Sequence, residues 1–254
     1  MAKVDFERRF GGMARLYGQA ALERFARAHV CVIGIGGVGS WAVEALARSA
    51  VGELTLIDLD HLAESNINRQ LPALDSTLGA AKIEVMARRV ADINPAARCH
   101  LVDDFVTTDN VAALLDAGFD FVIDCIDSFR VKVAIVRHCK GRRIPLVTVG
   151  GAGGQVDPAR VRVSDLSRTE QDPLLAKLRR ELRQRHGFSR NPRRSFGVPA
   201  VWSDEPLVRH PEGPQSCEGM GGGALNCGGF GSCTPVTATF GMVAAAHVLK
   251  KLAG

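Results

Sequence analysis

The chain has 254 residues, of which 46% are hydrophobic and 23% are charged. These fractions are ordinary for a folded globular protein, so they exclude a disordered, collagen-like or coiled-coil chain. One Tyr and two Trp are too few for a surface that stacks single-stranded bases. The formal net charge is +5, and the positive charge is concentrated in one segment.

The chain shows no secretory signal and no membrane span. Its first ten residues include five charged side chains and precede no apolar run. The most apolar stretch, 236–249, contains two Thr and one His and is shorter than the roughly 20 residues of a span, so we expect a buried helix there. The seven Cys form no Cys-x-x-Cys pair, which disfavours structural zinc and favours free thiols in a reducing compartment. The sequence therefore predicts a cytoplasmic protein without zinc.

Short apolar segments alternate with helical segments in the first 154 residues. We predict strands at 29–34, 54–58, 119–124 and 144–149, and helices at 41–50, 79–93 and 130–140. This alternation predicts an α/β fold with a doubly wound, mostly parallel Rossmann-like sheet. Such sheets bind ligands at the carboxyl ends of their strands, so the loops after the predicted strands should line one crevice.

The pattern changes after Gly154. A short strand at 161–163 and a basic helix at 172–186 precede a Gly- and Pro-rich stretch at 191–231, which we predict to be irregular. We expect this C-terminal part to be the substrate region, within one continuous domain.

A glycine-rich turn follows the first predicted strand. Gly34, Gly36, Gly37 and Gly39 satisfy Gly-x-Gly-x-x-Gly between a strand and a helix, where glycines let backbone N–H groups approach phosphates. Asp58, at the end of the second predicted strand, is placed to accept hydrogen bonds from a ribose. These two features fit a nicotinamide dehydrogenase equally well.

The segment that follows the second predicted strand distinguishes a site for a nucleoside triphosphate from a nicotinamide site. It contributes a polar set that consists of Asp60, Asn66, Arg69, Gln70 and, at the next predicted helix, Lys82. Hydride transfer does not require these polar and cationic side chains, whereas cleavage of a triphosphate requires cations that offset the phosphate charge. Asp127, after a later strand, supplies a carboxylate for the accompanying magnesium. The set therefore predicts an ATP site.

One segment holds most of the excess positive charge. Residues 177–194 carry a net charge of +7, against −2 for the rest of the chain. Its cations are Lys177, Arg179, Arg180, Arg183, Arg185, Arg190, Arg193 and Arg194. Such a density indicates contact with a polyanion, whose affinity would fall with salt. The alternative is a solvated helix face.

These motifs resemble the ubiquitin-activating-type adenylating enzymes, which also activate the sulfur carriers of molybdopterin and thiazole synthesis. The resemblance covers about residues 9–154 and lies in Gly-x-Gly-Gly-x-Gly-Ser, Asp-x-Asp, Ser-Asn-x-x-Arg-Gln, the downstream Lys and Asp-Cys-x-Asp. It implies that Asp58 holds the ribose, that Asn66, Arg69 and Lys82 hold the phosphates, and that Asp127 holds magnesium.

The same resemblance implies an N-terminal Arg that reaches the phosphates of the partner subunit. The family pattern is Arg-aromatic-x-Arg-Gln, but the second Arg is absent from this chain. Arg9 or Arg15 would have to take its place.

A branch of this family, the tRNA threonylcarbamoyladenosine dehydratases, resembles nearly the whole chain. The matching segments are 8–12, 15–18, 31–41, 102–106, 150–155, 171–174 and 236–241. The branch implies ATP-dependent cyclisation of the threonylcarbamoyl group on the adenosine beside the anticodon, through a carboxyl-adenylate. It further implies tRNA as partner and a homodimer, and it allows a monovalent cation and a sulfur-transfer protein.

The resemblance makes residues 1–154 the ATP-binding adenylation region and 155–254 the tRNA-facing region with the C-terminal helix. Cys227 is the candidate acyl acceptor, because relatives that transfer a carrier protein use a Cys thioester and the neighbouring glycines could expose this thiol. Cyclisation requires no nucleophile, so an incidental thiol is the alternative. The candidate catalytic residues are Arg69, Lys82, Asp127 and Cys227.

Two other functions remain open. The first is adenylation of the C-terminus of a ubiquitin-like sulfur-carrier protein, although those enzymes usually hold zinc with two Cys-x-x-Cys pairs. The second is a non-catalytic scaffold, one half of an adenylating heterodimer. Such halves typically lose the phosphate-site cations, whereas Arg69 and Lys82 are present in this chain.

Overall fold

A single seven-stranded sheet forms the centre of the molecule in a computed structural model, which describes residues 5–191, 193–208 and 230–254. The strand order is β3-β2-β1-β4-β5-β7-β6, and every neighbouring pair is parallel except β6 with β7. The strands are β1 (His29–Ile33), β2 (Glu53–Ile57), β3 (Arg98–Val102), β4 (Phe121–Asp124), β5 (Leu146–Val149), β6 (Val161–Asp165) and β7 (Pro199–Ser203). The predicted α/β fold is confirmed.

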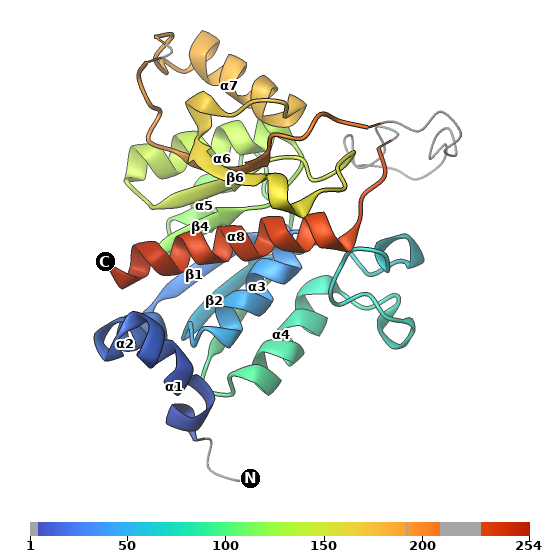
Figure 1. Cartoon of the computed structure of the whole chain (residues 1–254), viewed down its shortest axis with the longest axis vertical. Helices are drawn as coiled ribbons and strands as arrows, with labels where there is room; N and C mark the ends of the chain where they lie inside the picture. The colour runs from blue at the N-terminus through green and yellow to red at the C-terminus, as the bar shows by residue number, and fades with distance from the viewer. Residues whose placement is uncertain (1–4, 192, 209–229) are drawn as a thin grey trace.

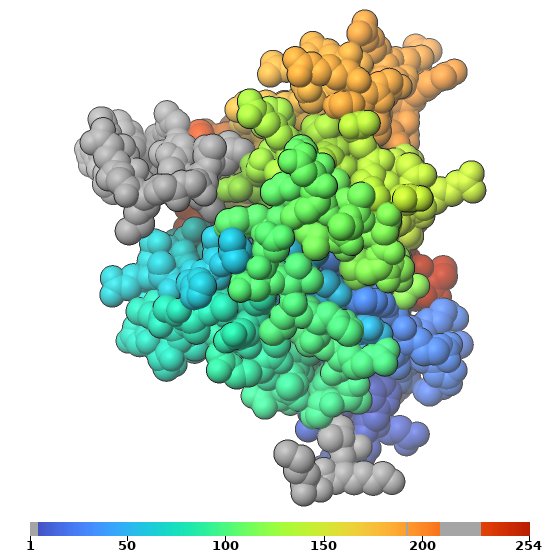
Figure 2. All heavy atoms as spheres, turned by 180° about the vertical axis from the view of Figure 1, so that it is seen from behind, coloured from blue at the N-terminus to red at the C-terminus, as the bar shows by residue number. Residues whose placement is uncertain are grey.

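Helices cover both faces of the sheet, as a doubly wound fold requires (Figure 1). They are α1 (Phe6–Tyr17), α2 (Gln19–Arg27), α3 (Gly39–Arg48), α4 (Lys82–Ile93), α5 (Val111–Leu115), α6 (Phe129–Arg142), α7 (Pro173–Arg185) and α8 (Thr234–Ala253). The helices α3, α4 and α8 pack on one face, whereas α5, α6 and α7 pack on the face seen in Figure 2.

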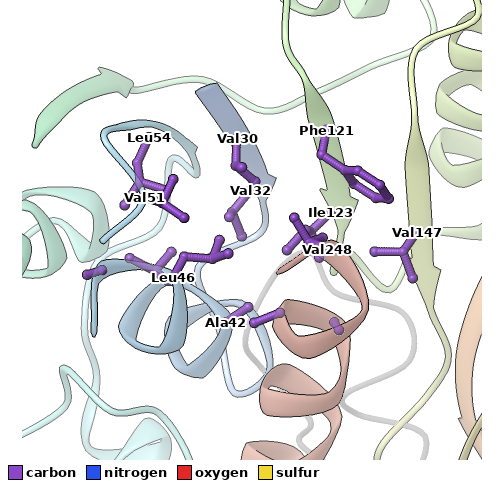
Figure 3. Packing of buried hydrophobic residues seen from close by; sticks show 14 of the residues in the cluster. Val30, Val32, Ala42, Leu46, Val51, Leu54, Phe121, Ile123, Val147 and Val248 are labelled. Carbon is purple, nitrogen blue, oxygen red and sulfur yellow. The ribbon is translucent and has the colours of Figure 1, made fainter. Parts of the chain in front are cut away.

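Strand β1 shows how the two faces are built. Its residues alternate, so that Val30 and Val32 enter the core under α3 and α8 while Cys31 and Ile33 enter the core under α5 and α6. Figure 3 shows the first of these cores, where Leu46 of α3 and Val248 of α8 meet the valines of β1. Helix α8 is the helix expected at 236–249, and it buries one face against the sheet while the other face is exposed. None of the described helices is long and apolar enough to cross a bilayer.

Two strands and the helices α1, α2 and α5 were not predicted from the sequence. The expectation of an irregular stretch at 191–231 is wrong at β7, which lies between β5 and β6. Pro199 lowers the strand signal there, but a Pro at the first residue of a strand is tolerated. Strand β3 is the exposed edge of the sheet, so it lacks the apolar pattern that predicts a strand.

The sheet order brings the predicted loops together. The strands β2, β1, β4 and β5 are neighbours and parallel, so their carboxyl ends lie at one edge of the sheet. The loops after Ile33, Ile57, Asp124 and Val149 therefore lie together at this edge, where open parallel sheets bind their ligands; this edge is called the crevice. The strands β6 and β7, from the C-terminal region, extend the same sheet.

Candidate active site

The glycine turn between β1 and α3 requires glycine at two positions. Gly34 has a φ of +84°, a conformation that side chains rarely adopt. A Cβ on Gly39 would clash with the carbonyl oxygen of Gly34, so the turn closes only with glycine there. The backbone N–H groups of such a turn, at the start of a helix, form a site for phosphate.

The polar segment after β2 packs against this turn. A Cβ on Gly37 would lie 3.1 Å from Cγ of Arg69, and one on Gly36 would lie 3.8 Å from Nε2 of Gln70. The indole of Trp41, on α3, donates a hydrogen bond of 3.1 Å to the carbonyl oxygen of Arg69. The structure thus brings the predicted glycines, Arg69 and Gln70 together.

Arg69 carries a charge that no described carboxylate offsets. Its guanidinium donates to two neutral oxygens, the carbonyl of Ser65 at 2.6 Å and the side chain of Asn68 at 3.0 Å. The side chain is half-buried, and burial lowers its pKa from the ordinary value of an arginine. A desolvated cation that faces only neutral acceptors favours an anion nearby.

Gln70 and Asn66 lie on the same segment in different environments. The side-chain oxygen of Gln70 is buried and accepts no hydrogen bond from the described residues, so a donor on a ligand or a water would satisfy it. Asn66 ends the short 3₁₀ helix Glu64–Asn66, and its side-chain oxygen accepts a bond of 3.1 Å from the N–H of Ala63.

Asp58 connects the end of β2 to the glycine turn. One carboxylate oxygen accepts a hydrogen bond of 2.5 Å from the N–H of Ile35, and the other accepts one of 2.8 Å from the N–H of Asp60. Burial raises the pKa of Asp58, and the nearby charge of Lys82 opposes that shift. Each oxygen retains a further lone pair that can accept from a ribose hydroxyl.

Lys82 begins helix α4 and reaches back to the loop after β2. Its ammonium lies 2.7 Å from a carboxylate oxygen of Asp60, while 6% of its side chain is exposed. This ion pair keeps the ammonium of Lys82 close to Asp58 and the crevice, where it can also contact a phosphate.

Asp127 follows β4 and lies beside the glycine turn. The residues before it, Cys125 and Ile126, are in van der Waals distance of Cβ positions on Gly34 or Gly39. Its carboxylate is partly exposed, and no hydrogen bond or ion pair joins it to another described residue. A free carboxylate in this position is suited to a hard cation such as magnesium.

A buried ion pair beneath the crevice was not predicted from the sequence. Lys132 of α6 lies 3.0 Å from the carboxylate of Asp124, and both side chains are fully buried. The hydroxyl of Thr148 donates to the same carboxylate at 2.7 Å, and Lys132 donates to that hydroxyl at 3.2 Å. The other oxygen of Asp124 accepts from the N–H of Ile126, so the pair holds the turn that precedes Asp127.

Asp172 joins the glycine-rich turn after β5 to helix α7. One of its oxygens accepts from the N–H of Gly151 and the other from the N–H of Leu175, both at 2.9 Å. The second bond caps α7, because it satisfies one of the unpaired donors of the first turn. A Cβ on Gly150 would clash with this carboxylate.

The basic segment divides into two groups. Arg179 donates to the hydroxyl of Thr169, and Arg183 lies over the ring of Phe196 at 5.2 Å and donates to the carbonyl oxygen of Ser167, so both side chains have partners within the chain. The other predicted cations are exposed: Lys177, Arg180, Arg185, Arg190, Arg193 and Arg194. Arg185 pairs with Glu181 at 3.1 Å.

Four described cysteines are poor nucleophiles. Burial raises the pKa of Cys125 and of Cys139 to about 12, raises that of Cys99 to about 11, and raises that of Cys31 further. A thiol with so high a pKa is protonated at neutral pH and unreactive. The predicted acyl acceptor, Cys227, lies outside the described residues, as does Cys217.

The two candidate N-terminal arginines differ in their surroundings. Arg9 donates to the carbonyl oxygens of Asp92 and Ile93, at 3.1 and 2.8 Å, and so caps the end of α4. Arg15 is exposed on α1. Its side chain makes no hydrogen bond or ion pair with another described residue.

Comparison with known proteins decides the family. Residues 11–254 match the ThiF family. The chain belongs to the ThiF family. This match extends through the C-terminal region, including β6, β7 and α8.

Relatives in the ThiF family are similar over almost the full length. The tRNA threonylcarbamoyladenosine dehydratase of Haemophilus influenzae is 51% identical over 255 residues, which is 99% of this chain and 96% of that protein. The crystal structure of the E. coli tRNA N6-threonylcarbamoyladenosine dehydratase in complex with ATP has a TM-score of 0.88 and 51% identity, and the match covers 99% of this chain and 96% of that one. A more distant relative, the molybdopterin-synthase adenylyltransferase of Salmonella typhimurium, is 36% identical over 131 residues, or 52% of this chain and 51% of that protein.

Proposed function

We propose that this chain is an ATP-dependent tRNA threonylcarbamoyladenosine dehydratase, which cyclises the modified adenosine beside the anticodon. The observation that carries the ATP site is the half-buried Arg69, which faces the glycine turn with only neutral acceptors among the described residues. The similarity to dehydratases over 99% of the chain supports the tRNA substrate. The similarity to a sulfur-carrier adenylyltransferase covers about half of it and favours that alternative less.

The reaction has two chemical steps. The free carboxylate of the threonylcarbamoyl group attacks the α-phosphate of ATP, which forms a carboxyl-adenylate and releases pyrophosphate. The neighbouring carbamoyl group then attacks the activated carbonyl and releases AMP with loss of a proton. The net change in the nucleoside is the loss of one water.

The site residues would divide this work by their chemistry. Asp58 would accept from the ribose hydroxyls, and the glycine turn would donate N–H groups to the phosphates. Arg69 and Lys82 would offset the negative charge that grows on the departing pyrophosphate, which is where fixed cations lower a barrier most. Lys82 would exchange its contact with Asp60 for one with phosphate, and Asn66 and Gln70 would add neutral polar contacts.

Magnesium fits this donor set. Asp127 offers a carboxylate oxygen free of other partners among the described residues, which is the ligand type that magnesium prefers. Bound there, the ion would add positive charge beside the phosphates. The residues of this chain would still bind and orient the two substrates.

The proposal includes an assembly and partners. In a homodimer, the exposed Arg15 would reach the phosphates of the other subunit, because Arg9 is engaged with α4. Exposed cations of the segment 177–194 would contact tRNA. The proposal also includes a cytoplasmic location and accommodates a monovalent cation and a sulfur-transfer protein. Cys227 would act only if the acyl group passed through a thioester.

One experiment tests the reaction directly. Purified protein is incubated with ATP, magnesium and tRNA that carries threonylcarbamoyladenosine, and the nucleosides are weighed after gentle digestion. We expect a nucleoside lighter by one water, formed only with ATP. An unchanged nucleoside from protein that ATP still stabilises against heat would reject the dehydratase and favour a carrier-protein carboxylate. Absence of stabilisation by ATP would favour the scaffold.

A further inference from the structure

A groove of about 660 Å³ lies between α6 and α7, on the face of the molecule shown in Figure 2. Its lining includes Arg130 and Arg137 of α6 and Arg185 at the end of α7. The cation-rich lining contains one carboxylate among the described residues, that of Glu181. The groove therefore has an excess of positive charge.

The two cations of α6 that line the groove, Arg130 and Arg137, have no anionic partner in the described part of the chain. Arg130 lies with its guanidinium 5.9 Å from the centre of the Phe129 ring, and Arg137 is exposed without an ion pair. They are seven residues apart, which places them on one face of the helix at a separation of about 10 Å. Glu181 is already paired with Arg185.

His186 lies with Arg137 and Arg185 in the lining of the groove. Burial lowers the pKa of His186, and the charge of Arg137 lowers it further; the charge of Glu181 opposes this shift and that of Arg185 adds to it. Like charges held close together without sufficient counter-charge destabilise a fold. A polyanion bound in the groove would remove that repulsion.

The lining of the groove includes Phe129 and Arg130, close to Asp127 along the chain. Helix α6 begins at Phe129, two residues after Asp127, and Arg130 lies in its first turn. A strand of nucleic acid that follows α6 therefore approaches the predicted adenylation site from this side.

We propose that the groove between α6 and α7 binds the phosphate backbone of the RNA substrate, with Arg130 and Arg137 as phosphate contacts. This inference rests on the proposed function for the identity of the RNA. It adds α6 to the exposed cations of the segment 177–194, so that the RNA-binding surface includes both helices. Contacts of this kind position the RNA without reading its sequence.

The test compares two double variants that remove the same charge. R130A/R137A removes the cations of the groove, and R27A/R88A removes two exposed arginines on α2 and α4, helices of the opposite face. Affinity for tRNA is measured between 50 and 200 mM salt for both variants and the unaltered protein. Stabilisation by ATP is measured in parallel to show that each variant is folded.

We expect R130A/R137A to bind tRNA more weakly and to lose less affinity as salt rises. Loss of two phosphate contacts lowers the slope of log affinity against log salt by about 1.4 to 1.8, so its loss over this range should be about tenfold smaller than that of the unaltered protein. R27A/R88A should retain the original slope. Equal slopes of log affinity against log salt for both variants, or unchanged tRNA binding by R130A/R137A, would overturn the proposal that the groove binds RNA. If R130A/R137A shows the smaller slope while the unaltered protein binds tRNA but leaves the nucleoside unchanged, the proposed reaction fails and the groove is still supported as an RNA-binding site.

Discussion

The ammonium of Lys82 lies 2.7 Å from a carboxylate oxygen of Asp60 at the edge of the crevice. The two residues are 22 positions apart, and helix α4 begins at the lysine. An aspartate therefore holds the cation that is predicted to meet the phosphates.

We expect Lys82→Ala to lower the rate of nucleoside conversion by about 10²- to 10³-fold, because it removes one fixed charge that stabilises the transition state. Lys82→Arg, which keeps the charge, should retain more of the rate. The rates are measured by mass spectrometry of the nucleoside, with Lys250→Ala, an exposed lysine of α8, as the control. A Lys82→Ala variant as fast as the unaltered enzyme would remove Lys82 from the catalytic set.

Gly39→Ala should abolish stabilisation by ATP. The added Cβ would collide with the carbonyl oxygen of Gly34, so the turn that presents N–H groups to phosphate could not close. Gly141→Ala is the matched control, because its Cβ, in the last turn of α6, would meet no atom within 4 Å. We expect that change to leave ATP binding intact and to stabilise the helix by up to about 1 kcal/mol. The readout is the shift in Tm on adding ATP.

The buried pair of Lys132 and Asp124 should dominate the stability of the crevice floor. Lys132→Met leaves a buried carboxylate without its cation, which costs about 3 to 5 kcal/mol of unfolding free energy. Adding Asp124→Asn to Lys132→Met should recover part of that loss, because the buried charge is then gone. Urea unfolding of both single variants and the double variant measures the coupling. Additive losses would show that the two side chains act independently.

Glu44 should make stability depend on pH. Burial opposes its ionisation, but hydrogen bonds from Arg89 and Arg48 prevail and lower the pKa of Glu44 below its ordinary 4.5. A lowered pKa in the folded state stabilises the protein above the unfolded pKa, and this contribution is lost as the pH falls through the folded pKa.

Glu44→Gln should therefore cost about 1 to 3 kcal/mol at pH 7. The difference from the unaltered protein should shrink once the pH falls below about 4.5. Unfolding free energies at pH 7 and at successively lower pH values test this, with the exposed Glu23→Gln as the control. A difference that stays constant with pH would mean that packing, and not the charge of Glu44, joins α3 to α4.

Cysteine variants test the thioester route. Burial keeps the thiol of Cys125 protonated beside the crevice, so Cys125→Ala should retain turnover. Cys227→Ala should also retain it, because the carbamoyl group of the substrate can attack the adenylate directly. Loss of nucleoside conversion in Cys227→Ala, with stabilisation by ATP unchanged, would instead assign Cys227 as the acyl acceptor.

The sequence predicts the site best where the functional residues are close to one another along the chain. The glycine turn is a local requirement of the backbone, so its spacing alone indicates the phosphate site. Asp124, Thr148 and Lys132 meet because β4 lies beside β5 in a register that pairs Asp124 with Thr148. The sequence does not specify that register without the sheet order. The same limit hides Arg137, which becomes part of a groove only when α7 packs against α6.

Helix α7 starts from the carboxylate of Asp172, which also holds the glycine-rich turn at the end of β5. The hydrogen bonds to Gly151 and Leu175 restrict the movement of α7, which is proposed to bind the RNA, relative to the edge of the sheet where the chemistry would occur. The distance between RNA bound on α7 and the adenylation site would then be fixed. Only a base at that distance from the bound backbone would reach the adenylate. In this arrangement Asp172 would contribute to substrate selection, because it fixes the distance between the RNA-binding helix and the adenylation site.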